Sequence, residues 1–111
     1  MPPDAKKYLY DMRKACALLS EFTKGKTLQQ YLSDPMFRSA VERQFEIVGE
    51  AVYQMLKRYP DLASSIPDFR AIINFRHILA HGYDRIDDEV VWDVVQVNLP
   101  VQCNYLDSLS H

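Results

Sequence analysis

Apolar side chains recur along this chain at the three- and four-residue spacing that places them on one face of a helix, without strand-like alternation. The pattern predicts four main helices, over residues 4–22, 34–59, 68–80 and 87–108. The chain has only three glycines, so short loops are expected between the helices. We therefore predict an all-α fold, an antiparallel four-helix bundle, in a single domain that covers residues 1–111.

Residues that favour helix starts and stops agree with the first two helices. Thr27 can cap a short extra helical turn after the first helix. Asp34 followed by Pro35 is a start signal, because a side-chain cap precedes a proline at the first helical position. Pro60 ends the second main helix, and residues 61–65 are expected to form a connector.

The last helix carries one irregularity. Asp87 and the two acidic residues after it place negative charge at its first turn, which the helix dipole favours. Pro100 lies inside the helix and cannot donate to the carbonyl of Gln96, so a kink is expected there.

The third helix, over residues 68–80, is apolar nearly all round. This predicts burial nearly all round, either by neighbouring helices or by these and a second subunit. Polar side chains interrupt the pattern: Asn74, His77 and His81 share one face, and Arg76 lies within the apolar stripe. Burying a guanidinium costs free energy unless it is paired or lines a wet cleft. The helix therefore predicts a polar cleft that binds an anion.

Arg76 and His81 are separated by about 7.5 Å along the helix axis and by about 140° around it. They do not share a face, but a phosphate at the helix end can reach both because arginine is long and forked. Histidine can transfer protons near neutral pH, and arginine can stabilise charge that develops on a phosphate. The pair suits RNA cleavage without a metal, with a second copy across a two-fold axis completing the site.

A purely structural interpretation of these residues stays open. Arg76 can pair with Glu46 or Glu50 of the second helix, and Arg43 can join such an ion-pair network. In that interpretation the histidines are satisfied core residues.

A metal site is the third interpretation. His77 and His81 have the spacing of two ligands on one helix face. Ile78 stands where the glutamate of an HExxH motif would be, and no third ligand is evident. No metal and no cofactor are therefore expected.

Composition limits the partners. Apolar residues make up 48% of the chain, charged residues 25%, and the formal net charge is −2. This predicts no general basic surface, so RNA must bind through a local patch or a dimer groove, or bind weakly. Cys16 and Cys103 indicate no disulfide framework and are expected to be small buried apolar side chains. No signal peptide or membrane span is evident, which predicts a soluble cytoplasmic protein.

Residues 76–83 read RHILAHGY: an arginine, four residues, a histidine, one residue and a tyrosine. This arrangement resembles the signature of HEPN-domain ribonucleases, in the branch called HepT. The segments IPDFRAIINFRHILAHGYDRID, residues 66–87, and ERQFEIVGEA, residues 42–51, resemble the same branch. The proline-interrupted last helix is similar as well, so the resemblance covers the chain from about residue 8 to 106.

The resemblance implies a toxin of a toxin–antitoxin system, a metal-independent endoribonuclease that forms a homodimer through the helices bearing the motif. It makes Arg76 and His81 the catalytic residues, with His77, Asn74 and Tyr83 in support. The implied antitoxin is an MntA-like nucleotidyltransferase that silences the toxin by adding AMP to Tyr83. The added phosphate would lie beside Arg76 and His81 and block the substrate.

A second functional class stays open, because HEPN domains can also bind nucleotides or partner proteins without cleaving RNA. The intact Arg76, His81 and Tyr83 favour the enzyme. The identity of the RNA and the acid or base role of His81 do not follow from the sequence.

Overall fold

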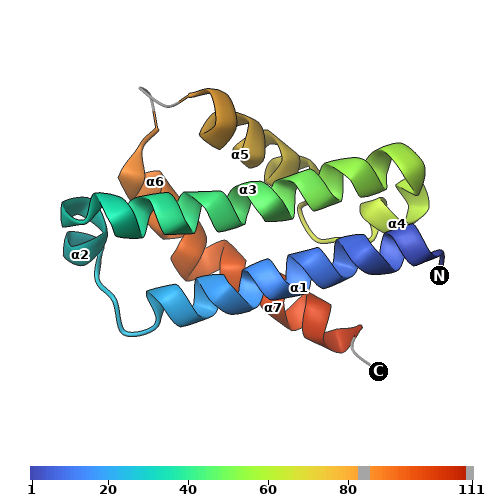
Figure 1. Ribbon diagram of the computed structural model, residues 1–111, viewed down its shortest axis with the longest axis horizontal. Coiled ribbons are helices and arrows are strands. Elements are labelled where there is room, and N and C mark those ends of the chain that lie inside the picture. Colours follow the sequence, from blue (N-terminus) through green and yellow to red (C-terminus); the bar gives the residue numbers. More distant parts are fainter. Residues whose placement is uncertain (83–85, 110–111) are drawn as a thin grey trace.

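The computed structural model describes residues 1–82 and 86–109, and within that part of the chain all regular structure is helical. The two longest helices, α1 and α3, lie antiparallel, α5 lies across one side of α3, and the α6–α7 column runs diagonally behind both (Figure 1). The all-α bundle predicted from the sequence is confirmed. The elements are α1 (Pro3–Thr23), α2 (Leu28–Ser33), α3 (Pro35–Arg58), α4 (Pro60–Ser64), α5 (Phe69–His81), α6 (Asp88–Asp93), the π-helical segment η1 (Val94–Asn98) and α7 (Leu99–Ser108).

Local capping explains where α2 and α3 begin. At α2, the Thr27 hydroxyl accepts from the backbone N–H of Gln30, and the Gln30 side chain accepts from the backbone N–H of Thr27. At α3, the Asp34 carboxylate accepts from the N–H groups of Met36 and Phe37 at 3.0 and 3.1 Å. Each bond satisfies a backbone donor that the first helical turn leaves without an intrahelical partner.

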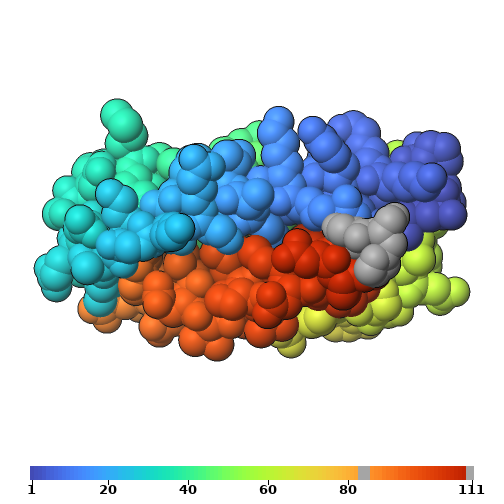
Figure 2. Space-filling view, turned by 90° about the horizontal axis from the view of Figure 1, so that it is seen from below, coloured from blue at the N-terminus to red at the C-terminus, as the bar shows by residue number. Residues whose placement is uncertain are grey.

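The core lies between α1, α3 and the α6–α7 column. Figure 2 shows α7 lying along α1 on one face of the molecule. The inward stripes supply most of the fully buried side chains, and Tyr31 of α2 closes one end against Trp92 of α6, at a ring-centroid distance of 5.3 Å. In the described part of the chain, no helix is long and apolar enough to cross a membrane.

The connector predicted for residues 61–65 is wrong, because residues Pro60–Ser64 form the short helix α4. Pro60 ends α3 but occupies the first turn of the new helix, where its missing N–H costs nothing. The carbonyl of Tyr59 accepts from both Leu62 and Ala63 at 3.0 Å. Burial of Ala63 against the core gives this single turn a tertiary partner.

The irregularity expected near Pro100 takes the form of a π-helical turn. Residues Val94–Asn98 are π-helical, and the N–H of Leu99 bonds to the carbonyl of Val94, five residues back. The wider turn precedes Pro100 directly and accommodates a residue that cannot donate within an α-helix.

The burial predicted for the third helix is wrong for the chain on its own. Of the 13 residues of α5, only Leu79 is fully buried. The helix packs mainly on α3, which covers one side and leaves its opposite face to solvent. Ala71, Ile78 and Ala80 are exposed although they are apolar.

Candidate active site

Arg76 is held on the side of α5 that faces α3. Its Nη2 donates to Oε2 of Glu50 at 2.6 Å, and its guanidinium lies 5.3 Å from the ring centre of Tyr53. The second carboxylate oxygen of Glu50 accepts from Nε2 of Gln54 at 2.9 Å. The Arg76 side chain is 26% exposed, so this ion pair lies at the edge of the core rather than inside it. Glu50 uses one of the five guanidinium donors, and no other hydrogen bond of this guanidinium is found within residues 1–82 and 86–109.

Gly49 allows this close packing. A methyl group on Gly49 would overlap the Cβ of Arg76 and lie 2.7 Å from its Cγ. It would also lie 3.3 Å from the backbone oxygen of Ile72. The arginine stem therefore crosses α3 at the one position of that helix without a side chain. Glycine inside a helix costs stability in isolation, and here the close approach of two helices explains it.

The outer face of α5 carries the other polar residues. The rings of His77 and His81 lie 4.7 Å apart, one helical turn from each other, and both side chains are exposed. Asn74 is exposed on the same face. The histidines are therefore surface groups rather than satisfied core residues. His81 is the last residue of α5, where the N–H of Gly82 bonds to the carbonyl of Ile78 at 2.7 Å.

Within residues 1–82 and 86–109, no hydrogen bond or ion pair joins Arg76 to His81. The fold places the arginine on the α3 side of α5 and the histidine on the solvent side, as their spacing requires. Tyr83, expected to be the modification site, lies outside the described residues.

Of the carboxylates considered as partners for Arg76, the structure selects Glu50. Glu46 instead pairs with Arg43 at 3.6 Å, one turn away on the same helix, and the Arg43 side chain is 68% exposed. Sequence reasoning missed the roles of Tyr53 and Gln54. Their signal was present, because residues 50, 53 and 54 have the spacing of one helix face.

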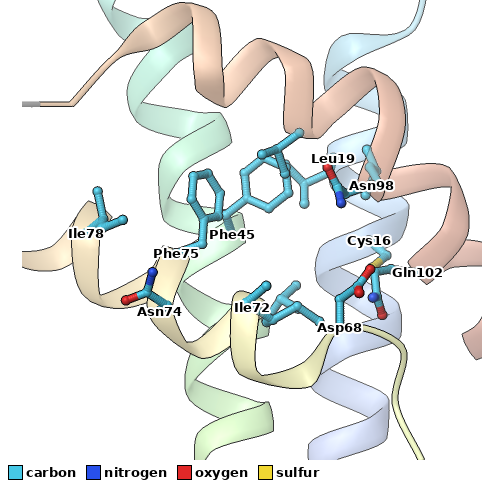
Figure 3. A pocket seen from close by; sticks show the side chains of 14 residues that line it. Cys16, Leu19, Phe45, Asp68, Ile72, Asn74, Phe75, Ile78, Asn98 and Gln102 are labelled. Carbon is cyan, nitrogen blue, oxygen red and sulfur yellow. The ribbon is translucent and has the colours of Figure 1, made fainter.

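A second feature missed from the sequence is a hollow of about 250 Å³ between α5 and the α6–α7 column. Figure 3 shows side chains of α1, α3, α5 and α7 surrounding it, with Phe45 and Phe75 on one side and Asn98 and Gln102 on another. The lining is mainly apolar. The hollow exists because α5 packs on α3 and leaves a gap between itself and α7. Ile78 of α5 stands at its edge.

A charged cluster joins α2, α3 and α6 at the other end of the bundle. Nη1 of Arg38 donates to the carbonyl of Leu32 at 2.6 Å, and its Nε lies 3.5 Å from a carboxylate oxygen of Asp88. Burial, together with the nearby charges of Asp88 and Glu46, raises the pKa of Glu42 above its usual value of 4.5. Arg38 opposes this shift without cancelling it.

The described part of the chain has no group of three or more histidine, cysteine, aspartate or glutamate side chains placed to hold a metal ion. The groups that the site offers are a positioned guanidinium and two exposed imidazoles. Imidazoles can move protons, and a guanidinium can stabilise a phosphate that gains negative charge. Groups of these kinds are suited to phosphodiester chemistry, in which protons move while a phosphate gains negative charge.

Comparison with known proteins identifies the family of this chain. The model of the ribonuclease HepT-like family matches residues 12–109. An inferred RNase of Methanocaldococcus jannaschii is 31% identical over 97 residues, which cover 87% of this chain and 88% of that protein. An inferred HepT ribonuclease of Thermococcus cleftensis is 34% identical over 95 residues, which cover 86% of each. No solved structure gives a significant match. The chain belongs to the ribonuclease HepT-like family and is an enzyme of the ribonuclease class.

Proposed function

We propose that this ribonuclease cleaves RNA without a metal ion, by attack of a ribose 2′-hydroxyl on the adjacent phosphate, as the cytoplasmic toxin of a toxin–antitoxin system. The observation that carries the mechanism is the division of α5, in which Glu50 and Tyr53 position Arg76 while His77 and His81 stay open to solvent. A proton-transferring group must reach the substrate, and a charge-stabilising group must be fixed before the substrate arrives.

In this mechanism Arg76 binds the scissile phosphate with the guanidinium donors that Glu50 leaves available. His81 transfers a proton at either the 2′-hydroxyl or the leaving 5′-oxygen. His77 and Asn74 lie on the same exposed face and can orient the RNA backbone. With His77 orienting the RNA, each chain has one imidazole for two proton transfers, so a second chain would supply the other.

The second chain would be another copy of this protein, packed against the outer face of α5. Ile78 lines the hollow beside this face and is 44% exposed, and Val97 and Val101 of the α6–α7 column are 65% and 48% exposed. Covering them would remove apolar surface from water, which drives association. A homodimer through the motif-bearing helix therefore completes the site and also covers the surface that the single chain leaves open.

The regulatory part of the proposal concerns Tyr83, two residues after His81 in sequence. An MntA-like nucleotidyltransferase would transfer AMP from ATP to its hydroxyl, with pyrophosphate as the leaving group, and bring a phosphate close to the helix end. The test is mass spectrometry of the Tyr83-containing peptide after co-expression with such an enzyme. An added multiple of AMP supports this antitoxin, and an unmodified peptide with active toxin contradicts it.

The central experiment follows a labelled single-stranded RNA treated with purified protein in EDTA. Attack by the 2′-hydroxyl predicts products with 2′,3′-cyclic phosphate and 5′-hydroxyl ends, and resistance of RNA that carries 2′-deoxyribose at the cleaved position. The Arg76→Ala and His81→Ala variants are the matched inactive controls. Products with 3′-hydroxyl ends, or full activity of His81→Ala in EDTA, would contradict the mechanism. RNA binding without cleavage would identify a binding module instead.

Subunit composition has its own test. If Arg76 of one chain and His81 of the other act at one site, a mixture of the Arg76→Ala and His81→Ala proteins regains activity that neither has alone. Sedimentation of the wild-type protein should give the mass of a dimer. A monomer that cleaves RNA at the full rate would exclude the shared site.

A further inference from the structure

The two cysteines of this chain meet across the contact between α1 and α7. Cys16 is 3% exposed on α1, and Cys103 is partly buried on α7. The Sγ atom of Cys103 lies 3.9 Å from the backbone oxygen of Cys16 and 3.5 Å from the hydroxyl oxygen of Ser20. Both thiols are free. We propose that they form a modification site at which hydrogen peroxide links Cys16 to Cys103 in a reversible intramolecular disulfide.

The surroundings of the two thiols shift their pKa values in opposite directions. A hydrogen bond from Cys16, reinforced by Ser20, lowers the pKa of Cys103 below its usual value of 9.0. The same hydrogen bond, reinforced by burial, raises the pKa of Cys16. Cys103 has the lowered pKa and is also the more exposed of the two, so it forms the attacking thiolate more readily, whereas Cys16 stays protonated beside it.

The chemistry proceeds in two steps. The thiolate of Cys103 attacks one oxygen of the peroxide, the O–O bond breaks, and hydroxide leaves. The sulfur is oxidised to a sulfenic acid, and the peroxide is reduced. The sulfur of Cys16 then loses its proton and attacks the sulfur of Cys103. The S–S bond forms, the S–O bond breaks, and the departing hydroxide takes the proton as water.

The positions of Cys16 and Cys103 in the chain determine how the disulfide affects the stability of the fold. The new bond joins the first long helix to the last one and closes a loop that contains most of the chain. Such a link restricts the unfolded chain more than the folded one, so it stabilises the fold. A reducing compartment keeps the thiols free, and the disulfide forms only when peroxide exceeds the reducing capacity.

The test treats the intact protein with hydrogen peroxide at low protein concentration, blocks remaining thiols and digests with trypsin without reductant. Cleavage after Lys14, Lys24 and Arg85 places the cysteines in peptides 15–24 and 86–111. A linked pair of these peptides, two hydrogen atoms lighter than their sum and released by dithiothreitol, is expected. The oxidised protein should also melt higher than the reduced protein, by roughly 5 °C or more.

Two variants separate the steps. Cys16→Ser retains the attacking thiol and should accumulate a sulfenic acid at Cys103 that dimedone traps. Cys103→Ser should leave Cys16 reduced at the same peroxide concentration, because Cys16 is buried. Peroxide treatment that yields no linked peptide, that links separate chains, or that oxidises Cys16 equally fast in Cys103→Ser would overturn the proposal.

Discussion

The two sides of α5 differ in what the rest of the chain does for them. On one side, Arg76 is paired with Glu50, stacked near Tyr53 and fitted against Gly49. On the other side, the rings of His77 and His81 contact only each other among the aromatic rings of the described residues, and both side chains are exposed. The chain thus uses tertiary contacts to place the arginine and none of comparable strength to place the histidines.

This difference matches what the two kinds of group must do. A guanidinium stabilises developing charge best when it is fixed before the reaction, because reorientation would cost free energy in the transition state. A proton-transferring imidazole must approach the substrate and change protonation state near neutral pH. The α3 side of α5 should therefore respond to mutation in both stability and activity, and the outer side in activity alone.

The largest expected effect is that of His81→Ala on RNA cleavage. Loss of a proton-transferring group should slow single-turnover cleavage by roughly 100-fold or more. Because the side chain is exposed, the free energy of unfolding should change by less than about 0.5 kcal/mol. Urea unfolding and cleavage of labelled RNA measure the two quantities, with the exposed Gln96→Ala as control. A large loss of stability in His81→Ala would remove the contrast between the two sides.

Gly49→Ala tests the close approach on the other side. The added methyl group overlaps the stem of Arg76, so α5 must move away from α3. We expect the free energy of unfolding to fall by about 1–3 kcal/mol, although alanine is the better helix former. Urea unfolding measures it, and Ser39→Ala, at an exposed position of the same helix, is the control. A more stable Gly49→Ala protein would show that the contact is not tight.

Glu50→Ala and Glu46→Ala form a matched pair on α3. Glu50 bonds at 2.6 Å to a guanidinium whose side chain is only 26% exposed, so its loss should destabilise the fold by about 1 kcal/mol and slow cleavage. Glu46 pairs at 3.6 Å with an arginine side chain that is 68% exposed, and its loss should cost less than about 0.5 kcal/mol. Denaturant unfolding and cleavage rates compare the two. Equal effects would mean that Glu50 does not position Arg76.

The smallest effect concerns pH and lies away from α5. The folded chain holds the pKa of Glu42 above its usual value of 4.5, so ionisation of this carboxyl opposes folding. The loss of stability begins as the pH rises past about 4.5 and is complete above the raised pKa. Glu42→Gln should therefore raise the free energy of unfolding at pH 7, by less than about 1 kcal/mol. The difference should disappear as the pH falls below about 4.5, where both states protonate the carboxyl. A gain that persists at pH 3 would contradict this electrostatic cause.

Most helix limits follow from the sequence because their causes are local. Asp34 bonds to donors two and three residues away, and Thr27 and Gln30 form a reciprocal cap within one turn. The same reasoning failed for α4, where a proline that ends one helix also begins the next. That single turn is retained because it buries Ala63, and such burial depends on distant parts of the chain.

The sequence by itself determined that the chain is helical, where its main helices lie, and that Arg76 and His81 point to different sides of α5. Each of these follows from spacing within one helix or from bonds across one turn. Only the tertiary structure decided that Glu50 rather than Glu46 holds Arg76, that the outer face of α5 stays open beside an apolar hollow, and that Cys16 meets Cys103. A helical repeat specifies which residues share a face, but the packing of segments far apart in the sequence decides what covers that face.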